Sequence, residues 1–591
     1  MRKGIGVSPG VAVGTAYCIR EIFVNPHTRR LEQRQVLPEL TRYDDARRRT
    51  AADLRTMYQK ISRQVGPEAG AIFLAHETIL NDPALSANIR KLIVEQRMSA
   101  QAALRQQLDE YSTLFARTKD AYLKERLSDV RDVFVRLSGH LSEVLQTTGE
   151  ALSGPLIVVA DELLPSHVMT LGDRDVSGVV TQTGGQTSHA AILARGRGIP
   201  AVSGVVGILK QVKTGDVIIV DGREGHVIVD PDPETESAYR KLEREFFLLK
   251  DELAENRDLP AVTADGEQIE LLANINSTAD AAAAVAMGAS GVGLYRTEYL
   301  FLTHADVPDE EEQLTAYREV IAASPNRYAT IRTLDLGGDK TVPYLGIARE
   351  ANPFLGWRSI RLSFENPEFF ATQIRAILRA AATETTSDQT AEKTQVRMMF
   401  PMITTLEEIR RVRGMVRRAQ KQLEEQGIVY GDVPLGLMLE VPAAAVCIRS
   451  LLEVVDFVSI GSNDLIQYLM AADRDNPKVS HLCQPLSPAV LHVLNDVIGA
   501  CNEADKPVSL CGEMAGSPRA FVLLLGMGLS TFSMSPAFVP TIKDLARHVT
   551  RAQAQAILKH VLGLKTTAHV MRYMAKQIAE IAPNLELLDT A

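Results

Sequence analysis

Residues 434–464 read PLGLMLEVPAAAVCIRSLLEVVDFVSIGSND and contain the pattern that decides the fold. An apolar run, PLGLMLE, ends on Glu440, a helical segment follows, and a second apolar run, VDFVSI, leads to Asp464. Short apolar runs separated by helical segments predict parallel strands joined by crossover helices. Since both carboxylates come directly after a strand, this unit predicts polar groups at the carboxyl ends of a parallel sheet.

The same unit recurs from about residue 260 onward. The strand-like runs are IELLAN, GVGLY, YATIRTLDL, VRMMFPM, PLGLMLE, VDFVSI, PVSLCGE and STFSM. Polar residues follow nearly every run, and the active sites of (β/α)₈ barrels collect at the carboxyl ends of the strands. We therefore predict a TIM barrel over residues 258–575. A doubly wound open sheet is the competing arrangement.

The chain before the barrel changes character twice. Residues 25–146 are poor in glycine and carry apolar side chains at helical spacing, which predicts an all-α insert. Residues 1–24 begin with short strand-like runs, and residues 147–231 show strands and turns around a short helix, which predicts a compact α/β domain. Residues 232–257 are long, charged and helical in pattern, which indicates a linker helix. Residues 576–591 are expected to form a C-terminal tail.

Length and composition exclude several classes of protein. The 591 residues suggest three to five domains, at about 100–200 residues per domain. The net charge of −9 argues against a protein that coats nucleic acid or a membrane surface. No apolar run reaches the roughly 18 residues of a spanning helix, and glycines interrupt the apolar N-terminal stretch. The five cysteines are irregularly spaced and indicate reduced thiols, so we expect a cytoplasmic protein.

Four arginines lie in or near loops that follow predicted strands: Arg296, Arg332, Arg358 and Arg474. A single loop arginine is usually solvated, but four that converge on one barrel mouth would clamp a polyanion, because guanidinium binds phosphate and carboxylate in a bidentate manner. Lys340 in the GGDKT segment is a further candidate for an anion contact. That segment lacks the spacing of a Walker loop, so it does not predict an ATP site.

Two carboxylates and one thiol complete the candidate barrel site. Glu440 and Asp464, with waters and substrate oxygens, suit Mg²⁺; the alternative is that they only pair with the arginines. Cys511 follows the seventh strand in SLCGEMAG, where a thiol can exchange a proton; the alternative is a buried structural cysteine. No CxxC pair occurs in the chain, which argues against zinc.

His189 is the candidate nucleophile of the smaller α/β domain. In GGQTSHAAILAR it follows a double-glycine turn and stands in the first turn of a predicted helix. The free N–H groups and the dipole of a helix N-terminus stabilise an anion and favour neutral imidazole. The placement therefore suits a histidine that receives a phosphoryl group, although a structural histidine is the commoner case.

Together these motifs closely resemble the Enzyme I family of the bacterial sugar phosphotransferase system, the phosphoenolpyruvate–protein phosphotransferases. The matching strings are GGQTSHAAILAR, GVGLYRTEYLF, RTLDLGGDK, NPFLGWRSIR, LMLEVPAA, GSNDLIQY, ADRDN and SLCGEMAG. The resemblance covers essentially the whole chain. It implies one discontinuous phosphohistidine domain formed by residues 1–24 and 147–231. It also implies that the helical insert of residues 25–146 docks the phosphocarrier HPr, and that the barrel binds phosphoenolpyruvate and forms a homodimer.

The resemblance also implies a role for each candidate residue. His189 would carry the phosphoryl group on its tele nitrogen, and Cys511 would donate the proton that converts enolpyruvate to pyruvate. Glu440 and Asp464 would bind Mg²⁺. The implied substrate ligands are Arg296, Arg332, Asn463, Asp464 and Arg474, supported by Arg358 and Lys340. The expected reaction moves the phosphoryl group of phosphoenolpyruvate to His189 and then to a histidine of HPr, the first step of sugar uptake.

Three positions depart from the wording expected of the family, namely Gln186, Ser462 and Asp475, and none of them is an expected ligand. The alternative enzyme is a relative of pyruvate-phosphate dikinase or phosphoenolpyruvate synthase that lacks the ATP domain, since no region remains for a nucleotide-binding domain. A non-catalytic scaffold would have lost site residues, which are present here. The start at GIGVSPG favours the sugar-transport branch over the nitrogen branch, which carries an additional N-terminal sensory domain.

Overall fold

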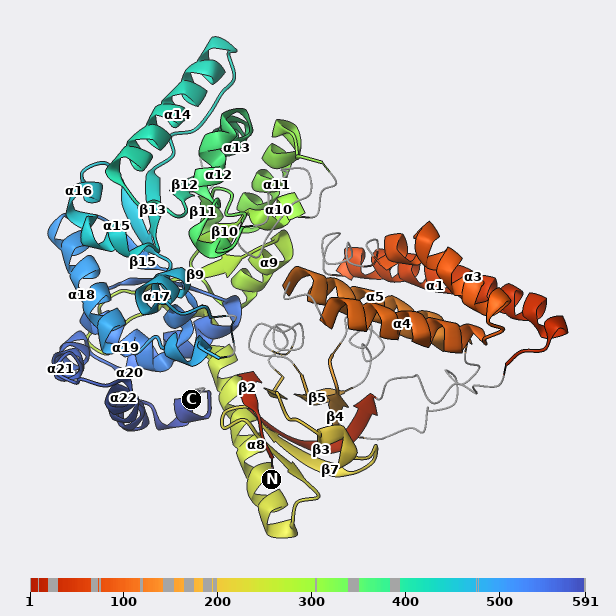
Figure 1. Cartoon of the computed structure of the whole chain (residues 1–591). Coiled ribbons are helices and arrows are strands. Elements are labelled where there is room, and N and C mark those ends of the chain that lie inside the picture. Colours follow the sequence, from red (N-terminus) through yellow and green to blue (C-terminus); the bar gives the residue numbers. More distant parts are fainter. Residues whose placement is uncertain are drawn as a thin grey trace. The chain divides into compact units, whose positions relative to one another are not determined.

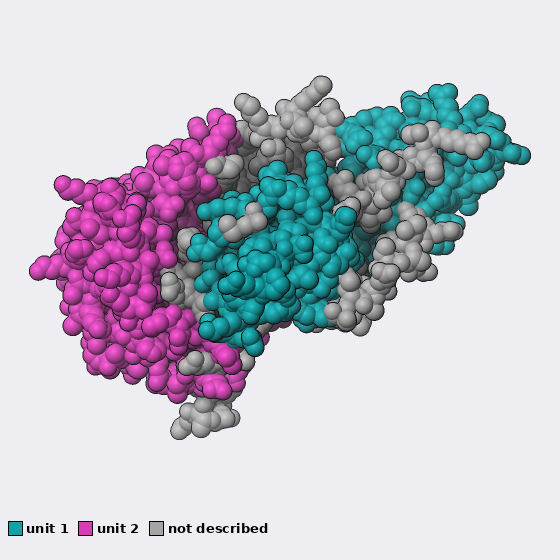
Figure 2. All heavy atoms as spheres, turned by 90° about the horizontal axis from the view of Figure 1, so that it is seen from below, with its two compact units in different colours: residues 1–246, 590–591 teal, residues 247–589 magenta. Residues whose placement is uncertain are grey.

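The computed structural model describes residues 2–8, 10–19, 30–64, 73, 76–116, 121–141, 154–163, 175–183, 194, 199–302, 306–337, 350–382, 394–474, 476 and 478–588. The chain forms two compact units, residues 1–246 with 590–591, and residues 247–589 (Figures 1 and 2). None of the described helices is long and apolar enough to cross a membrane.

The first unit contains an eight-stranded sheet in the order β1-β8-β7-β3-β4-β5-β6-β2. The strands are β1 (Arg2–Lys3), β2 (Ile5–Ser8), β3 (Val11–Ile19), β4 (Leu156–Ala160), β5 (Val176–Thr181), β6 (Ala201–Ser203), β7 (Val217–Asp221) and β8 (His226–Val229). Strands β3 to β6 are parallel neighbours, and the outer pairings are antiparallel. Every residue of β4 is buried, as expected for a central parallel strand.

The insert between β3 and β4 is helical, as its composition predicts. Its helices are α1 (Val36–Gln64), α3 (Pro83–Glu95), α4 (Ala100–Ala116) and α5 (Ala121–Leu141). Asp82 caps the N-terminus of α3: its carboxylate accepts hydrogen bonds from the backbone N–H groups of Ala84 (2.7 Å) and Leu85 (3.4 Å). A separate apolar core holds the four helices together, with Tyr43, Leu54, Ile89, Leu104 and Phe134 buried in it.

Helix α8 (Pro233–Glu255) carries the chain from the first unit into the second (Figure 1). In the part of the helix that belongs to the first unit, Glu243 accepts a hydrogen bond from the backbone N–H of Val13 (2.9 Å), and Phe246 is buried. In its second half, Leu249 and Leu253 belong to the core of the second unit. The helix is therefore continuous across the boundary between residues 246 and 247.

The second unit is a closed barrel of parallel strands, which confirms the predicted TIM barrel and excludes the open sheet. Its strands are β9 (Glu270–Ile275), β10 (Val292–Arg296), β11 (Tyr328–Arg332), β12 (Gln395–Phe400), β13 (Leu435–Leu439), β14 (Phe457–Ile460), β15 (Val508–Leu510) and β16 (Thr531–Met534). The barrel closes through β16 and β9, with Thr531 opposite Glu270 and Met534 opposite Ala273. Each predicted run became one strand.

Helices follow the strands and cover the barrel: α9 (Thr278–Ala286), α10 (Glu298–Leu302), α11 (Glu310–Ala323), α12 (Ile360–Glu365), α13 (Pro367–Ala380), α14 (Leu406–Glu425), α15 (Pro442–Val446), α16 (Ile448–Leu452), α17 (Ser462–Met470), α18 (Pro488–Glu503), α19 (Pro518–Gly526), α20 (Val539–His548), α21 (Arg551–Val561) and α22 (Thr567–Ile581). Helix α22 runs through the expected tail boundary at residue 575, because it buries Val570, Met574 and Ile578 at a four-residue spacing.

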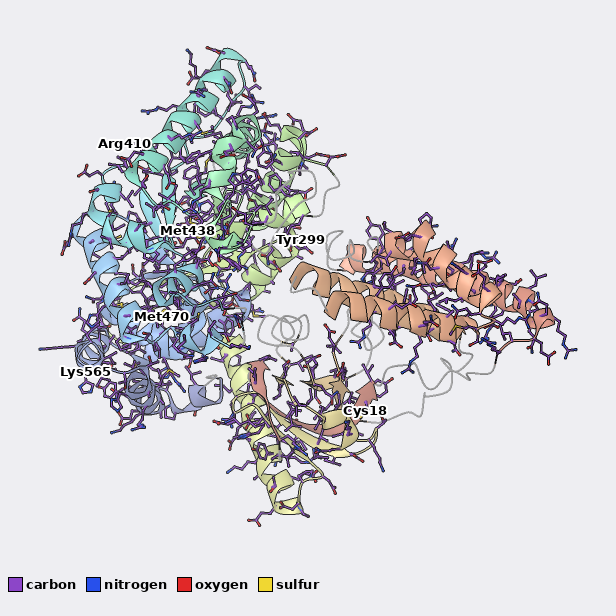
Figure 3. All side chains as sticks on the ribbon, in the orientation of Figure 1. Cys18, Tyr299, Arg410, Met438, Met470 and Lys565 are labelled. Atoms are coloured by element: carbon purple, nitrogen blue, oxygen red, sulfur yellow. The ribbon has the colours of Figure 1, made fainter. Side chains whose placement is uncertain are left out.

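The barrel has one large core and a small second one. The large core includes apolar side chains from both the strands and the helices, for example Leu271, Ile331 and Phe521. The small cluster contains Leu294, Met399, Met438, Phe457 and Cys511. Met438, which Figure 3 labels on the ribbon of β13, also contacts an arginine of the candidate site. The small cluster therefore borders the polar groups that follow the strands.

Candidate active site

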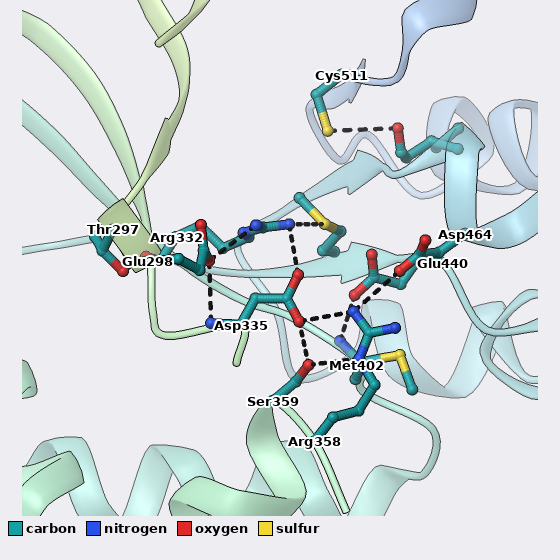
Figure 4. Close-up of polar contacts among 12 residues, drawn as sticks. Thr297, Glu298, Arg332, Asp335, Arg358, Ser359, Met402, Glu440, Asp464 and Cys511 are labelled. Carbon is teal, nitrogen blue, oxygen red and sulfur yellow. Dashed lines mark hydrogen bonds and ion pairs between the residues drawn. The ribbon is translucent and has the colours of Figure 1, made fainter. Parts of the chain in front are cut away.

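Arg332 ends β11 and lies between two carboxylates (Figure 4). Its NH2 is 2.8 Å from Oε1 of Glu298, and its NH1 is 3.1 Å from Oδ2 of Asp335. Burial lowers the pKa of Arg332, but these carboxylates outweigh burial, so the pKa lies above its usual value. The buried Nε of Arg332 has no hydrogen-bond partner in the described part of the chain. This donor is thus available to a ligand.

Arg358 and Arg474 continue the same network. The NH2 of Arg358 is 3.0 Å from Oδ1 of Asp335 and 3.2 Å from Oδ2 of Asp464. The other oxygen of Asp464 is 3.0 Å from NH1 of Arg474. Carboxylates and guanidinium groups therefore alternate across the site, from Glu298 to Arg474. Three of the four predicted arginines belong to this network, and Asp464 is the ion-pair partner of two of them, Arg358 and Arg474.

The local backbone explains how Arg358 reaches Asp335. Gly337 has φ of +109°, and a Cβ atom there would lie 2.3 Å from the Cβ of Arg358. Ser359 has φ of +54°, a left-handed conformation that is unfavourable for a residue with a side chain. The Ser359 hydroxyl donates a hydrogen bond to Asp335, and its backbone N–H donates one to the Leu336 carbonyl (2.7 Å). These contacts hold the strained turn in place.

Glu440 follows β13 and is 2% exposed. Its Oε1 accepts a hydrogen bond of 2.6 Å from the backbone N–H of Met402, a left-handed residue with φ of +55°. Burial, and then the nearby charges of Asp335 and Asp464, raise the pKa of Glu440 to about 8. Three carboxylates thus repel one another at this position, and an added cation would relieve that repulsion.

Arg296 ends β10 and differs from the other arginines. Burial, together with the charge of Arg332, lowers the pKa of Arg296. Within the described ranges, no carboxylate lies within ion-pair distance of Arg296, although Arg332, Arg358 and Arg474 each have such a partner. A half-buried cation whose nearest carboxylates, Glu298 and Glu513, lie beyond ion-pair distance is only partly compensated. This side chain therefore favours a bound anion.

Cys511 follows β15 and is 2% exposed. Its thiol lies 3.5 Å from the carbonyl oxygen of Ile460 and packs in the small apolar cluster of the barrel. Burial raises the pKa of the Cys511 thiol, which keeps it protonated. The next residue, Gly512, approaches Ser462 so closely that a Cβ would lie 1.8 Å from its hydroxyl oxygen. The glycine lets the ends of β14 and β15 meet.

Asn463 links the same two loops. Its Oδ1 accepts a hydrogen bond of 3.0 Å from the backbone N–H of Glu513. The structure therefore gathers the predicted barrel residues at the carboxyl ends of the strands. His189 and Lys340 lie outside the described residues. Sequence reasoning missed two side chains of the network: Glu298, which pairs with Arg332, and Ser359, which donates a hydrogen bond to Asp335. The only signal in the sequence was that Glu298 stands close to the end of β10.

The donor set fits a hard divalent cation at Glu440 and Asp464. No group of three His, Cys, Asp or Glu side chains in the described part of the chain is arranged to hold a metal. Mg²⁺ does not require such a group, because it is usually held by one or two carboxylates, waters and substrate phosphate oxygens. The raised pKa of Glu440 is consistent with a carboxylate that needs a nearby positive charge to ionise.

Comparisons with known proteins match nearly the whole chain. Three family models match: the N-terminal (residues 3–126), mobile (152–225) and PEP-binding (250–587) domains of PEP-utilising enzymes. A phosphoenolpyruvate-protein phosphotransferase of Bacillus sp. (strain S) is 38% identical over 574 residues, 97% of each chain. The Haemophilus influenzae protein of that name is 37% identical over 585 residues, 99% of this chain and 100% of the relative. The Bacillus subtilis protein is 37% identical over 573 residues, 97% of this chain and 98% of the relative.

Proposed function

Because the chain belongs to the Enzyme I family of phosphoenolpyruvate–protein phosphotransferases, we propose that it transfers the phosphoryl group of phosphoenolpyruvate to His189 and then to the carrier HPr. The observation that best supports the barrel as the substrate site is Arg296, a half-buried guanidinium with no carboxylate within ion-pair distance among the described residues. A phosphate or carboxylate of the substrate would supply the missing negative charge. The free Nε of Arg332 points to the same kind of ligand.

The residues proposed to bind the substrate have different roles. Arg296 and Arg332 bind the phosphate, Arg474 and Asn463 complete the binding site, and Arg358 holds Asp464 in place. Lys340 is proposed as an additional anion contact. Guanidinium groups fixed by carboxylates stabilise the charge on the transferring phosphoryl group without having to reorganise.

Glu440 and Asp464 are the proposed Mg²⁺ ligands. Both carboxylates are buried, and burial, followed by the charges of Asp335 and Asp464, raises the pKa of Glu440, which supports a cation at this position. When bound, Mg²⁺ supplies positive charge for the oxygens of the substrate. Arg358 and Arg474, which bind Asp464, keep this carboxylate oriented.

The reaction then needs a nucleophile and an acid. The tele nitrogen of neutral His189 attacks phosphorus, and the bond from phosphorus to the enol oxygen breaks. The Cys511 thiol gives its proton to the terminal carbon of enolpyruvate, which yields pyruvate. Phospho-His189 passes its phosphoryl group to HPr at the helical insert, whose separate core supports an independent docking body. We also propose that the barrel forms a homodimer.

Incubation with labelled phosphoenolpyruvate and Mg²⁺ tests this function. We expect an acid-labile label on the protein that moves to purified HPr, and no label when a chelator removes the metal. Labelled ATP is the parallel sample, because a dikinase relative would take its phosphoryl group from ATP. Labelling from ATP, or a label that does not move to HPr, would contradict the proposal.

Arg296→Met separates ligand binding from folding. Removal of a half-buried charge that has no ion-pair partner among the described residues should leave the free energy of unfolding unchanged or higher. At phosphoenolpyruvate about 100-fold above its Kd, the ligand should add about 2.7 kcal/mol to the unfolding free energy of the unsubstituted protein, and much less to that of the variant. Thermal unfolding with and without ligand measures this. Arg449→Met is the control, because Arg449 forms an exposed surface pair with Glu503. Full ligand stabilisation of Arg296→Met would show that Arg296 does not bind the substrate.

A further inference from the structure

Glu298 makes two contacts with a single oxygen at the start of α10. Its Oε1 accepts a hydrogen bond from NH2 of Arg332 (2.8 Å) and another from the backbone N–H of Asp335 (3.0 Å) (Figure 4). Glu298 is 2% exposed, so water does not compete for these hydrogen bonds. Glu298 therefore fixes the distance between the guanidinium group and the loop that carries Asp335.

The segment after β11 is held by side chains rather than by neighbouring strands alone. The Thr297 hydroxyl donates to the carbonyl oxygen of Arg332 (2.9 Å), and the backbone N–H of Leu334 donates to Oε1 of Gln373 (3.0 Å). The amide nitrogen of Gln373 in turn donates to the Thr297 hydroxyl (3.2 Å). Thr297 and Gln373 are completely buried. The backbone on both sides of Arg332 is thus fixed before any ligand arrives.

These contacts leave the Arg332 guanidinium little freedom. Its NH2 is used by Glu298, its NH1 faces Asp335 and the sulfur of Met438 (3.5 Å), and its Nε has no described partner. We infer that Glu298 is a positioning residue, which orients Arg332 so that its free donor faces the phosphate of the substrate. This inference rests on the proposed function, in which Arg332 is a phosphate ligand.

A positioning role predicts that geometry matters as much as charge. Glu298→Gln keeps the shape and removes the charge, while Glu298→Asp keeps the charge and withdraws it by one methylene. Both variants should lower the single-turnover rate of phosphorylation by phosphoenolpyruvate about 10-fold or more, because a misplaced donor stabilises the transition state poorly. The apparent affinity for phosphoenolpyruvate should change less than about 3-fold, since the other ligands remain.

Glu310→Gln is the matched control. Glu310 pairs with Arg375 and Arg379 between outer helices of the barrel. The Glu310→Gln variant therefore loses a similar ion pair, but outside the site. The control should keep the phosphorylation rate of the unsubstituted protein, and thermal unfolding of all three variants reports their folding. A Glu298→Asp variant with the full rate would overturn the inference, because charge alone would then suffice. Equal rates for Glu298→Gln and Glu310→Gln would also overturn it.

Arg332→Lys tests whether Glu298 acts through Arg332. Lysine lacks the guanidinium fork, so adding Glu298→Gln to Arg332→Lys should lower the rate less than about 2-fold. A 10-fold additional loss would show that Glu298 acts through another group and would overturn the inference. Phosphorylation of the unsubstituted protein in the same assay distinguishes the two proposals. If the unsubstituted protein is not phosphorylated, the proposed function fails. If it is phosphorylated, the variants test only the role of Glu298.

Discussion

Replacement of His189 by alanine is expected to abolish covalent labelling by phosphoenolpyruvate, because no acceptor nitrogen remains for the phosphoryl group. Binding of phosphoenolpyruvate should persist, because the proposed binding groups belong to the barrel unit, residues 247–589, and His189 belongs to the other unit. The expected result is thus complete loss of the label with retained stabilisation of the barrel by substrate and Mg²⁺.

Acid-labile radiolabel counts the phosphorylated protein, and thermal unfolding with phosphoenolpyruvate and Mg²⁺ reports binding. His226→Ala is the control, since His226 begins β8 in the sheet of the first unit and is not an expected acceptor. It should label like the unsubstituted protein. A full label on His189→Ala would assign the acceptor to another residue. Loss of substrate stabilisation in His189→Ala would contradict the division of binding and transfer between the units.

The barrel network explains why the site is stable without substrate and still attracts one. Glu298, Asp335 and Asp464 neutralise Arg332, Arg358 and Arg474 through direct ion pairs. Arg296 and Glu440 have no such pairing within the described residues, and burial shifts both of their pKa values toward the neutral form. The two unmatched groups have opposite charges. An anionic substrate and a cation would therefore satisfy both.

The fold was predictable because the barrel strands have a simple signal. Each strand is a short apolar run, and polar residues follow at its carboxyl end, as after β13 and β14. The boundary inside α8 was not predictable from the sequence. Phe246 and Leu249 are both apolar and three residues apart, yet Phe246 belongs to the first unit and Leu249 to the barrel core. Only tertiary contacts decide which unit an apolar residue on a continuous helix joins.

The site was predictable only in part. Arg332 ends β11, Glu440 follows β13 and Asp464 lies in the first turn of α17 after β14, so their convergence follows from barrel geometry. The partners of these residues do not follow from it. Glu298 looks like an ordinary acidic residue in the first turn of a short helix, and its inward orientation depends on the position of the β11 loop. Ser359 has a positive φ although it is not glycine. The residue types in this segment therefore did not predict the turn that places Arg358 beside Asp335.

Cys511→Ala should slow the formation of pyruvate by about 10²–10⁴-fold, the usual contribution of a positioned acid or base. The thiol is 2% exposed, and water has little access to replace it as a proton donor. Burial raises the pKa of Cys511 above its ordinary value, which is about 8.5 for a free thiol. The donor therefore stays protonated as the pH rises through neutrality, and it is lost only when the pH exceeds this raised pKa.

The pH dependence distinguishes an acid from a structural cysteine. The rate of pyruvate formation, followed in single turnovers, should show no loss from thiol ionisation between about pH 7 and 8.5, the ordinary pKa of a thiol. Cys501→Ala is the control, because Cys501 is equally buried but lies on α18 away from the strand ends. It should keep the full rate. If Cys511→Ala forms pyruvate as fast as Cys501→Ala, the proton must come from another group. If both variants lose activity together with thermal stability, the loss comes from damaged packing and not from a missing proton donor. The role of Cys511 would then be to pack in its apolar cluster.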